Sequence, residues 1–364
     1  MSVRVAAVEA RRCAYAIDPP LVIAGRTIDR REYAVARVVS DSGATGSAYL
    51  YSEGERADEL VVERLAPQLV GRRLEDLGPD SVDVAVAGGD HALRRAGALL
   101  DLCLWDLRAQ AAGLPLWRLL GGGNRERVPV LMVDGYPRAG ETPSDLGRRI
   151  AARADEGYRT VKIAYAGSVD DLDACVREAR VGAAEPALVV DAVWLWRRAD
   201  DARETVARMC ELDLAWVEDP IPSAEVEEIR KLRDRAACPI GIGDDLTSLG
   251  TLAALVGREA IDVVRLDVTQ LGSIGRFRAA LALAAEAALP VSPHIYPELH
   301  QHLAFAHPGI THVELFPADS PFWFTTRFVR SDVFERIADG HLSPPTRPGL
   351  GLELDWDAVE AAPA

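Results

Sequence analysis

The sequence predicts an α/β fold in which an N-terminal α+β capping domain precedes a (β/α)8 barrel of the TIM type. Three observations support this prediction: a strand-rich start followed by helical segments, a middle part in which short apolar runs alternate with amphipathic stretches, and a tail too short for a domain of its own. We expect the capping domain over residues 1–125 and the barrel over 126–328. Residues 329–364 are expected to return to the capping domain and complete it.

The predicted capping domain begins with strands. Residues 4–15 and 32–39 have strand character, and the second run passes through the polar turn SDSGATG into SAYLYS, which is a hairpin pattern. Residues 57–71 and 91–113 then carry apolar side chains three and four positions apart, which is typical of helices. The glycines at 121–123 end this unit.

The middle part contains eight short apolar runs, each followed by a helix-like stretch. The runs are VPVLMV, RTVKI, ALVVD, LAWVED, PIGIGDD, IDVVRLD, LPVSPH and THVEL. Alternation of this kind predicts parallel strands joined by crossover helices. Eight units within about 200 residues match the lower size limit of a closed barrel.

Composition excludes several classes of protein. The 364 residues carry a formal net charge of −15, which argues against nucleic-acid binding because that rests on clustered Lys and Arg. No apolar run reaches the roughly 18 residues of a membrane span, and the N-terminus lacks the apolar block of a signal peptide, so we expect a cytoplasmic protein. The five cysteines are scattered and form no CxxC pair. They are expected to be small buried side chains, not disulfides or zinc ligands.

The most informative pattern is a polar group at the end of seven successive runs. These residues are spaced 20 to 29 positions apart, about one β/α unit, and are Lys162, Asp191, Glu218, Asp244, Asp267, His294 and Glu314. A single Asp or Glu after a strand is usually a helix cap or a loop charge. In a barrel, however, all seven positions converge on one mouth, where catalytic groups lie.

Three consecutive strand ends supply only carboxylates. Asp191, Glu218 and Asp244 are hard oxygen ligands, suited to Mg2+ or Mn2+ and poorly suited to softer ions. We therefore expect one divalent metal ion per subunit, with Mg2+ preferred.

The same residues carry a resemblance to a known family. Lysine on the second run, followed in order by VVDAVWLW, WVEDP, GIGDD, VVRLDVTQLGSIG, SPH and VEL, resembles the enolase superfamily in its mandelate racemase and muconate lactonizing enzyme branch. The segment ALLDLCLWDLRAQAAGLPLWRLLGG, leading into VPV, extends the resemblance over nearly the whole chain. The resemblance implies an enzyme that removes the α-proton of a carboxylate substrate, and a homo-oligomer.

The resemblance also assigns roles. The three carboxylates would bind the metal, Asp267 would hold His294 as a general base, Glu314 would be a hydrogen-bond donor or acid, and Lys162 would lie against the substrate carboxylate. Physical chemistry agrees, because a metal on a substrate carboxylate stabilises the enediolate formed on proton loss. A carboxylate beside an imidazole fixes its tautomer and sets its pKa.

The sequence departs from the family pattern at two places. The third ligand is Asp244 where many relatives have Glu, and its neighbour Asp245 is a rival for the position. The familiar Lys-x-Lys of the second strand ends in Ala164, so a second base is missing from that face of the substrate.

Racemisation needs an acid-base group on each face of the α-carbon, whereas β-elimination can use one. The leading hypothesis is therefore dehydration of a sugar acid. An epimerase or racemase, or a lactone cycloisomerase, of the same superfamily is the alternative. A barrel that binds a ligand without catalysis and a Schiff-base aldolase built on Lys162 are outside possibilities; carboxylates around the lysine would keep it protonated.

Several aromatic residues lie where a substrate could reach them. Tyr49, Tyr51, Trp194 and Tyr296 are possible substrate contacts, although tryptophan beside a barrel strand is more often packing. The remaining histidines near the seventh strand, at positions 300, 302, 307 and 312, are expected to be structural and not a transition-metal site.

Overall fold

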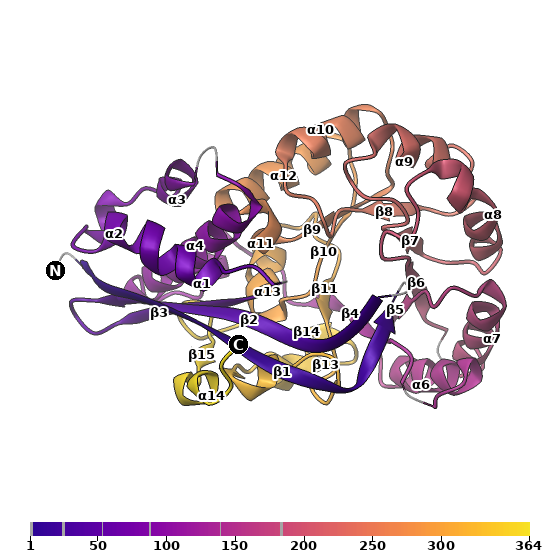
Figure 1. The fold of residues 1–364 in the computed structure, drawn as a ribbon, viewed down its shortest axis with the longest axis horizontal. Coiled ribbons are helices and arrows are strands. Elements are labelled where there is room, and N and C mark those ends of the chain that lie inside the picture. The colour runs from indigo at the N-terminus through magenta and orange to yellow at the C-terminus, as the bar shows by residue number, and fades with distance from the viewer. Residues whose placement is uncertain (1–2, 24–25, 53, 87–88, 139, 183–184) are drawn as a thin grey trace.

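The computed structural model describes residues 3–23, 26–52, 54–86, 89–138, 140–182 and 185–364. In Figure 1 the N-terminal α+β unit lies on the left and the barrel on the right. The predicted fold class is confirmed. Among the described helices, none is long and apolar enough to cross a membrane.

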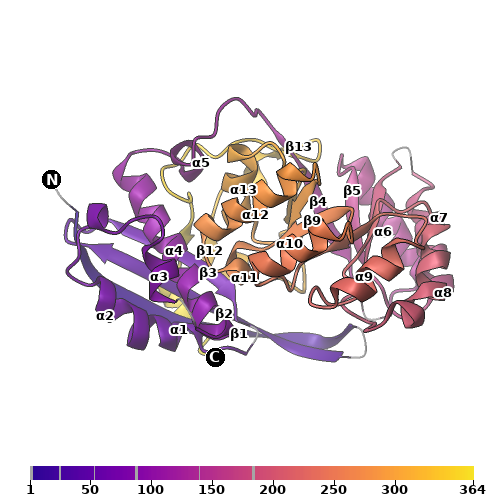
Figure 2. The same cartoon turned by 90° about the horizontal axis from the view of Figure 1, so that it is seen from above.

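The capping unit is a three-stranded antiparallel sheet covered by helices. Its strands run in the order β1 (Val5–Ile23), β2 (Arg26–Ser40) and β3 (Thr45–Tyr51), and the β2–β3 hairpin was predicted. β1 and β2 are longer than the sequence suggested, and their hairpin reaches beyond the cap helices toward the barrel (Figures 1 and 2).

One long helix packs on this sheet. Asp90 caps α4 (His91–Ala111) by accepting a hydrogen bond from the Leu93 amide at 2.9 Å. The helix approaches β3 at Gly46, where a Cβ atom would lie 2.1 Å from the Cys103 carbonyl oxygen. The shorter helical segments of the cap are α1 (Ala57–Leu60), the π-helical turn Val61–Leu65, α2 (Ala66–Leu69), the 3-10 turn Leu74–Asp76, α3 (Ser81–Ala85) and α5 (Leu116–Leu119).

Eight parallel strands form the barrel. They are β4 (Val128–Gly135), β5 (Thr160–Ala164), β6 (Ala187–Asp191), β7 (Trp216–Glu218), β8 (Ile240–Ile242), β9 (Val263–Leu266), β10 (Val291–Pro293) and β11 (Val313–Leu315). Each pairs with the next from β4 to β10 and β11 pairs with β4, while a parallel bridge between Val291 and Ile310 closes the ring. All eight predicted runs form strands.

Helices surround the barrel as expected for β/α units. They are α6 (Pro143–Asp155), α7 (Val169–Ala179), α8 (Ala199–Cys210), α9 (Val226–Arg233), α10 (Leu249–Gly257), α11 (Val268–Leu271), α12 (Ile274–Glu286) and α13 (Pro297–Ala306). Thr142 and Asp145 form a capping box at the start of α6, so the polar residues between runs fix where helices begin.

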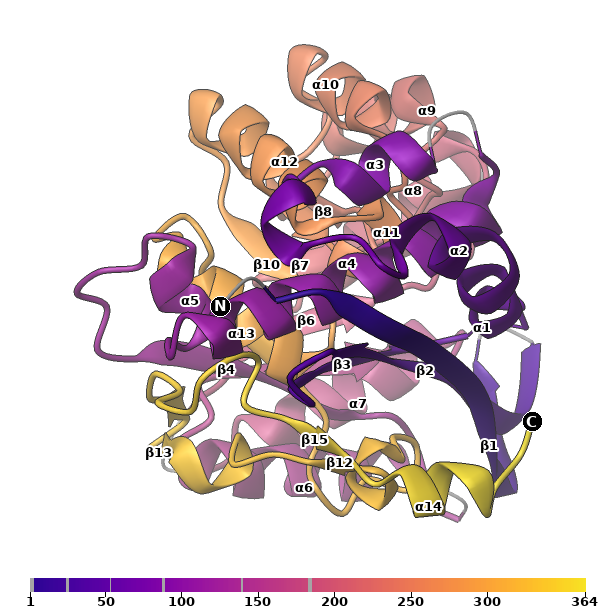
Figure 3. The same ribbon diagram turned by 90° about the vertical axis from the view of Figure 1, so that its left-hand side faces the viewer.

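The C-terminal tail packs on both units (Figure 3). Its elements are the 3-10 turns Thr325–Arg327 and Phe334–Arg336, the strands β12 (Val329–Arg330), β13 (Ile337–Ala338), β14 (His341–Leu342) and β15 (Glu353–Leu354), and the helix α14 (Trp356–Glu360). β14 pairs with β4 of the barrel. In the cap, the Ala14 amide donates to the Ala362 carbonyl at 2.8 Å, and the Leu350 amide donates to Asp106 at 2.7 Å.

The cysteine prediction was wrong for one pair. Cys210, at the end of α8, and Cys238, just before β8, form a disulfide. No local motif marks it, because the two residues lie 28 positions apart on consecutive β/α units. Cys13, Cys103 and Cys175 are buried free thiols, as expected.

Candidate active site at the barrel mouth

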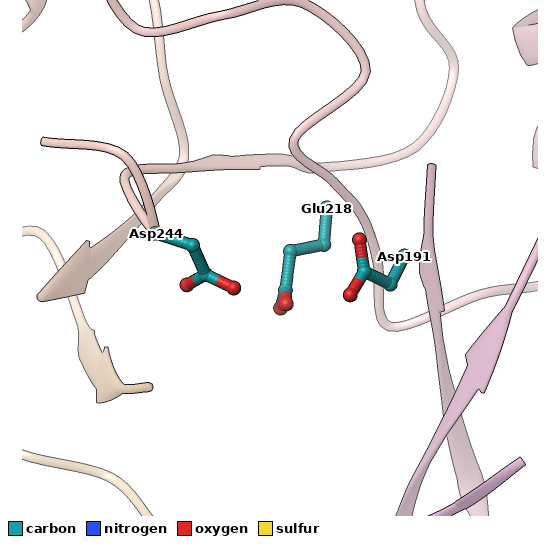
Figure 4. Close-up of side chains that lie close together, drawn as sticks. All are labelled: Asp191, Glu218 and Asp244. Atoms are coloured by element: carbon teal, nitrogen blue, oxygen red, sulfur yellow. The ribbon is translucent and has the colours of Figure 1, made fainter. Parts of the chain in front are cut away.

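Three carboxylates meet at the carboxyl ends of neighbouring strands. Asp191 ends β6 and Glu218 ends β7, and the two residues are paired in the strand register, while Asp244 follows β8. One oxygen of each lies within 4.8 Å of the others, and all three residues are buried (Figure 4). The structure thus brings together the three residues that the sequence nominated as metal ligands.

The turn after β8 selects Asp244 over Asp245. Gly243 has a φ of 140°, and a Cβ atom there would lie 2.2 Å from the Arg265 carbonyl oxygen, so only glycine fits. Asp219 holds this turn by accepting from the amides of Gly243 (2.8 Å) and Asp244 (3.1 Å). The Asp245 carboxylate accepts from the Ser223 amide at 3.1 Å and does not belong to the cluster of three carboxylates.

A buried lysine lies among the carboxylates. Lys162 Nζ donates to Glu218 Oε1 at 2.7 Å and to Glu314 Oε1 at 3.0 Å, and it lies 3.6 Å from Asp191 Oδ2. Burial alone would lower the pKa of Lys162, but Glu218 and Glu314 outweigh burial and raise the pKa well above its usual value. Lys162 is therefore a fixed positive charge and not the neutral amine that a Schiff-base aldolase needs.

A second buried cation, Arg265 on β9, was missed by the sequence analysis. Arg265 Nε lies 3.0 Å from Glu218 Oε2 and 3.1 Å from Asp244 Oδ1, and Nη2 lies 2.6 Å from Glu314 Oε2. Period-two alternation could have found it, because Arg265 lies two residues before Asp267 and so faces the same side of its strand.

The site carries more negative than positive charge. Five buried carboxylates face two fixed cations; the carboxylates belong to Asp191, Glu218, Asp244, Asp267 and Glu314. Burial raises the pKa of Asp191, and it raises that of Glu218 to about 7 despite Arg265 and Lys162. A divalent cation would relieve this excess, and a donor set made only of carboxylate oxygens fits Mg2+ or Mn2+. The residues present therefore fit the metal that the resemblance implies.

The predicted dyad is formed. His294 Nδ1 lies 3.0 Å from Asp267 Oδ2, and Asp267 Oδ1 accepts from the Thr269 amide at 2.7 Å. With its proton on Nδ1, the imidazole presents Nε2 to the triad, 3.6 Å from Asp244 Oδ2. Burial would lower the pKa of His294, but Asp244 and Asp267 raise it to about 9.

Glu314 accepts hydrogen bonds from both cations. Burial would raise its pKa, but Arg265 and Lys162 hold the pKa below its usual value. In this arrangement Glu314 is an ionised acceptor, so the geometry gives no support to the role of donor or acid expected from the resemblance.

Two of the four aromatic residues nominated as substrate contacts are internal. Tyr49 and Tyr296 are 0% and 1% exposed. The Tyr49 hydroxyl donates to Glu298 Oε2 at 2.7 Å, and the Tyr296 hydroxyl accepts from the Tyr51 amide at 2.9 Å. They join the cap to the barrel, and their interpretation as substrate contacts stays a prediction. Tyr51 and Trp194 are half-buried, and Trp194 Nε1 has no hydrogen-bond partner among the described residues.

Backbone strain gathers at the same mouth. Non-glycine residues with positive φ follow β6, β7 and β10: Val193, Trp194, Asp219, Ile295 and Tyr296. Such conformations cost free energy and persist where the surrounding structure enforces them, often at functional sites. Their position supports the assignment of this mouth as the active site.

Two of the remaining histidines near β10 accept hydrogen bonds from backbone amides. His300 Nε2 accepts from the Val268 amide at 3.1 Å, and His302 Nδ1 accepts from the Trp117 amide at 3.2 Å. Burial lowers the pKa of both imidazoles, and that of His302 falls to about 4.

The comparisons with known proteins agree with this geometry. Residues 6–121 match the family described as mandelate racemase / muconate lactonizing enzyme, N-terminal domain, and residues 145–358 match the family described as enolase C-terminal domain-like. The chain belongs to the mandelate racemase / muconate lactonizing enzyme group of the enolase superfamily. The resemblance inferred from the sequence is confirmed.

Similar proteins are enzymes acting on acids. L-Talarate/galactarate dehydratase of Salmonella typhimurium is 28% identical, over 93% of this chain and 84% of the relative, and muconate cycloisomerase 1 of Rhodococcus opacus is 27% identical, over 86% and 84%. A solved structure of L-talarate dehydratase from Polaromonas, complexed with Mg and L-glucarate, superposes with a TM-score of 0.83 at 26% identity, covering 99% of this chain and 97% of the other. A lyase of the dehydratase type fits these relatives.

Proposed function

We propose that this protein is a Mg2+-dependent dehydratase of a sugar acid, in which His294 removes the proton from the carbon next to the carboxylate. The observation that carries the proposal is the position of His294 Nε2, which lies 3.6 Å from Asp244 of the triad while Nδ1 lies against Asp267. When bound, the ion would act as a Lewis acid and stabilise the enediolate formed on proton loss. The dehydratases among the relatives support this reading.

Lys162 and His294 have different roles in the proposed reaction. Lys162 adds a fixed positive charge beside the position expected for the substrate carboxylate. His294 takes the α-proton as a neutral imidazole and, once protonated, can return a proton to the departing β-hydroxyl, which leaves as water. The resulting enol converts to a 2-keto acid. Atoms and charge balance with one acid-base residue.

The other face of the α-carbon lacks an equivalent base. Ala164 lies in register with Asp191 where a second lysine would stand, and it has no proton to exchange. Lys162, the nearest amine on the same strand, is held protonated by Glu218 and Glu314. A one-base site favours elimination over racemisation. The cycloisomerase relative keeps an isomerase as the second candidate.

Two measurements test the proposal. Aldonic and aldaric acids would be incubated with the Mg2+-loaded enzyme in D2O, and 2-keto product would be detected as a semicarbazone. A dehydratase yields this product. Deuterium in recovered substrate without keto product would replace dehydration with isomerisation, and neither signal with any acid would contradict both.

A pair of variants tests the base. His294→Asn should abolish α-proton exchange and lower kcat by about 10²–10⁴-fold, because general-base catalysis is lost. The matched control is His341→Asn, since His341 pairs with the amino end of β4, opposite the mouth. Exchange retained by His294→Asn would contradict its role as base.

A further inference from the structure

His91 joins the capping unit to the barrel segment that follows β9. It is the first residue of α4, and its Nδ1 atom lies 2.8 Å from Glu55 Oε1 in the loop after β3. Its Nε2 atom lies 2.7 Å from Oε1 of Gln270, which is buried in α11. Figure 1 shows α4 and α11 next to each other at the junction of the two units. One imidazole thus connects two elements of the cap with the barrel.

Both neighbours of this imidazole are oxygen atoms. A carboxylate oxygen and an amide oxygen only accept hydrogen bonds, so both ring nitrogens must donate, which requires the imidazolium. The hydrogen bond to Glu55 raises the pKa of His91, and that to Gln270 raises it further, although burial and Arg95 lower it. Arg95 lies one turn further along α4, with Nε 3.4 Å from Glu55 Oε2. Glu55 therefore lies between two cations of the same helix.

Gln270 belongs to the helical turn that begins at Asp267 of the dyad. Asp267 Oδ1 accepts from the Thr269 amide at 2.7 Å, while Oδ2 lies 3.0 Å from His294 Nδ1. A helix of only four residues is not stable by itself, so contacts with the surrounding structure decide where it lies. A shift of α11 at Gln270 would therefore also move the Asp267 carboxylate.

The cap also holds the chain just beyond α11. The Ile274 amide, at the start of α12, donates to Asp101 Oδ2 of α4 at 2.9 Å. Gly272 lies between this contact and α11, and its φ of 100° ends the helix. The contact of His91, in contrast, lies within the helix that begins at Asp267. Of these two cap contacts, the one made by His91 is therefore better placed to hold the dyad.

We propose that His91, as an imidazolium, is a positioning residue for the dyad: it holds α11 against the cap and so fixes Asp267, which in turn orients His294. The inference rests on the proposed function for the role of His294. A displaced Asp267 would orient the base less well, and displacements of about 1 Å can lower a rate about 100-fold. Proton transfer thereby depends on a docked cap.

The first test measures hydrogen exchange of the Thr269 amide by NMR, with Mg2+ and without substrate. This amide donates to Asp267, so its exchange rate reports whether the carboxylate keeps its place. His91→Phe removes both hydrogen bonds of the imidazole and keeps an aromatic ring. We expect exchange to become about 10- to 100-fold faster, the range for losing hydrogen bonds to a charged group.

The matched control is Arg12→Met. Arg12 on β1 pairs with Asp58 of α1 at 2.8 Å, so this variant weakens the cap without touching α11. It should leave the exchange rate of the Thr269 amide unchanged. Circular dichroism checks that both variants are folded.

The second test asks whether His91 acts through Asp267. In the assay of the proposed reaction, His91→Phe should lower kcat about 10- to 100-fold and leave KM within about twofold, because the groups that bind the substrate are unchanged. Added to Asp267→Asn, it should lower kcat by no more than about twofold further, because residues that act as one unit are not additive.

Gln270→Glu tests the charge of the contact without removing it. A carboxylate beside the imidazolium should raise the pKa of His91 above its wild-type value in NMR titrations. Because folding raises this pKa, the contact stabilises the protein fully below pH 6.5 and is lost as the pH rises through the folded-state pKa. Protection of the Thr269 amide, corrected for its intrinsic exchange rate, should therefore persist to higher pH in this variant.

Three results overturn the inference. One is an exchange rate of the Thr269 amide in His91→Phe no faster than in the control, another is a loss of kcat that adds in full to that of Asp267→Asn, and the third is a His91 pKa that Gln270→Glu leaves unchanged. The exchange and titration measurements need no substrate. Absence of a 2-keto product would therefore contradict the proposed dehydration and leave the test of His91 intact.

Discussion

The barrel and the capping unit contribute polar groups in different ways. Each barrel strand from β5 to β11 ends near one charged or titratable group, and these groups touch one another in a single buried network around Glu218 and Arg265. The cap contributes a few contacts from its hairpin strands, such as the Tyr51 amide, which donates a hydrogen bond to the Tyr296 hydroxyl at 2.9 Å. The barrel thus contributes a connected network of charged groups, whereas the cap contributes separate contacts at the junction.

The largest effect should come from the barrel dyad. Asp267→Asn keeps a side-chain acceptor for the Thr269 amide, so α11 should still form. An asparagine can donate a hydrogen bond to His294 Nδ1, which places the imidazole proton on Nε2. A protonated Nε2 cannot accept the α-proton of the substrate. We expect kcat to fall about 10²–10⁴-fold in steady-state assays. A fall of less than tenfold would mean that the carboxylate does not set the tautomer.

Removing the second buried cation should destabilise the barrel. Arg265→Gln leaves Glu218, Asp244 and Glu314 without their shared partner, so the free energy of unfolding of the metal-free protein should fall by about 3–5 kcal/mol in urea titrations. Mg2+ should recover a larger share of stability in this variant than in the wild type, because the ion replaces lost positive charge.

The control for this variant is Arg233→Gln. Arg233 pairs with Asp262 at 2.9 Å near the surface, where such pairs contribute about 1 kcal/mol or less. An equal loss of unfolding free energy in the two variants would show that the buried network contributes no more to stability than a surface ion pair.

The pKa of His294 offers a smaller, local measurement. In the metal-free protein it should titrate near 9, above the usual 6.5, because Asp244 and Asp267 favour the imidazolium more than burial disfavours it. Its protonation therefore stabilises the fold fully below pH 6.5, and this contribution disappears as the pH rises through 9. NMR titration checks the value, and Mg2+ should lower it by engaging Asp244. A metal-free value at or below 6.5 would contradict the geometry.

The smallest effect should come from the junction between the two units. Tyr49→Phe removes the hydrogen bond to Glu298, which keeps a second partner in Ser331 Oγ at 3.1 Å, so thermal unfolding should report a loss of about 1–2 kcal/mol. Because Tyr49 is fully buried, KM and kcat should stay within about twofold. A large rise in KM would instead support the interpretation of Tyr49 as a substrate contact.

The difference between the two regions also explains what could be predicted from the sequence. Barrel strands recur with a fixed period and end at one mouth, so Asp191, Glu218 and His294 could be grouped from spacing alone. Arg265 could have been added to this group, because alternation places it on the same side of its strand as Asp267, but the sequence analysis did not include it. Ala164 indicated that a second base is missing, because alternation places it on the same side of its strand as Lys162.

Other features depend on contacts that no local pattern encodes. The internal placement of Tyr49 and Tyr296 depends on how the cap docks onto the barrel. The Cys210–Cys238 disulfide joins two consecutive β/α units whose separation in space the sequence does not state. These features depend on tertiary packing, which local sequence patterns do not encode.

The tail has a consequence for the order of folding. Ala362 and Leu350 hydrogen-bond to Ala14 and Asp106 in the cap, so the described cap is built from two stretches of chain with the whole barrel between them. During synthesis, β1–β3 and α4 emerge first, yet they gain these last partners only after the eight β/α units have been made. We therefore expect the capping unit to reach its final form after the barrel on which it packs.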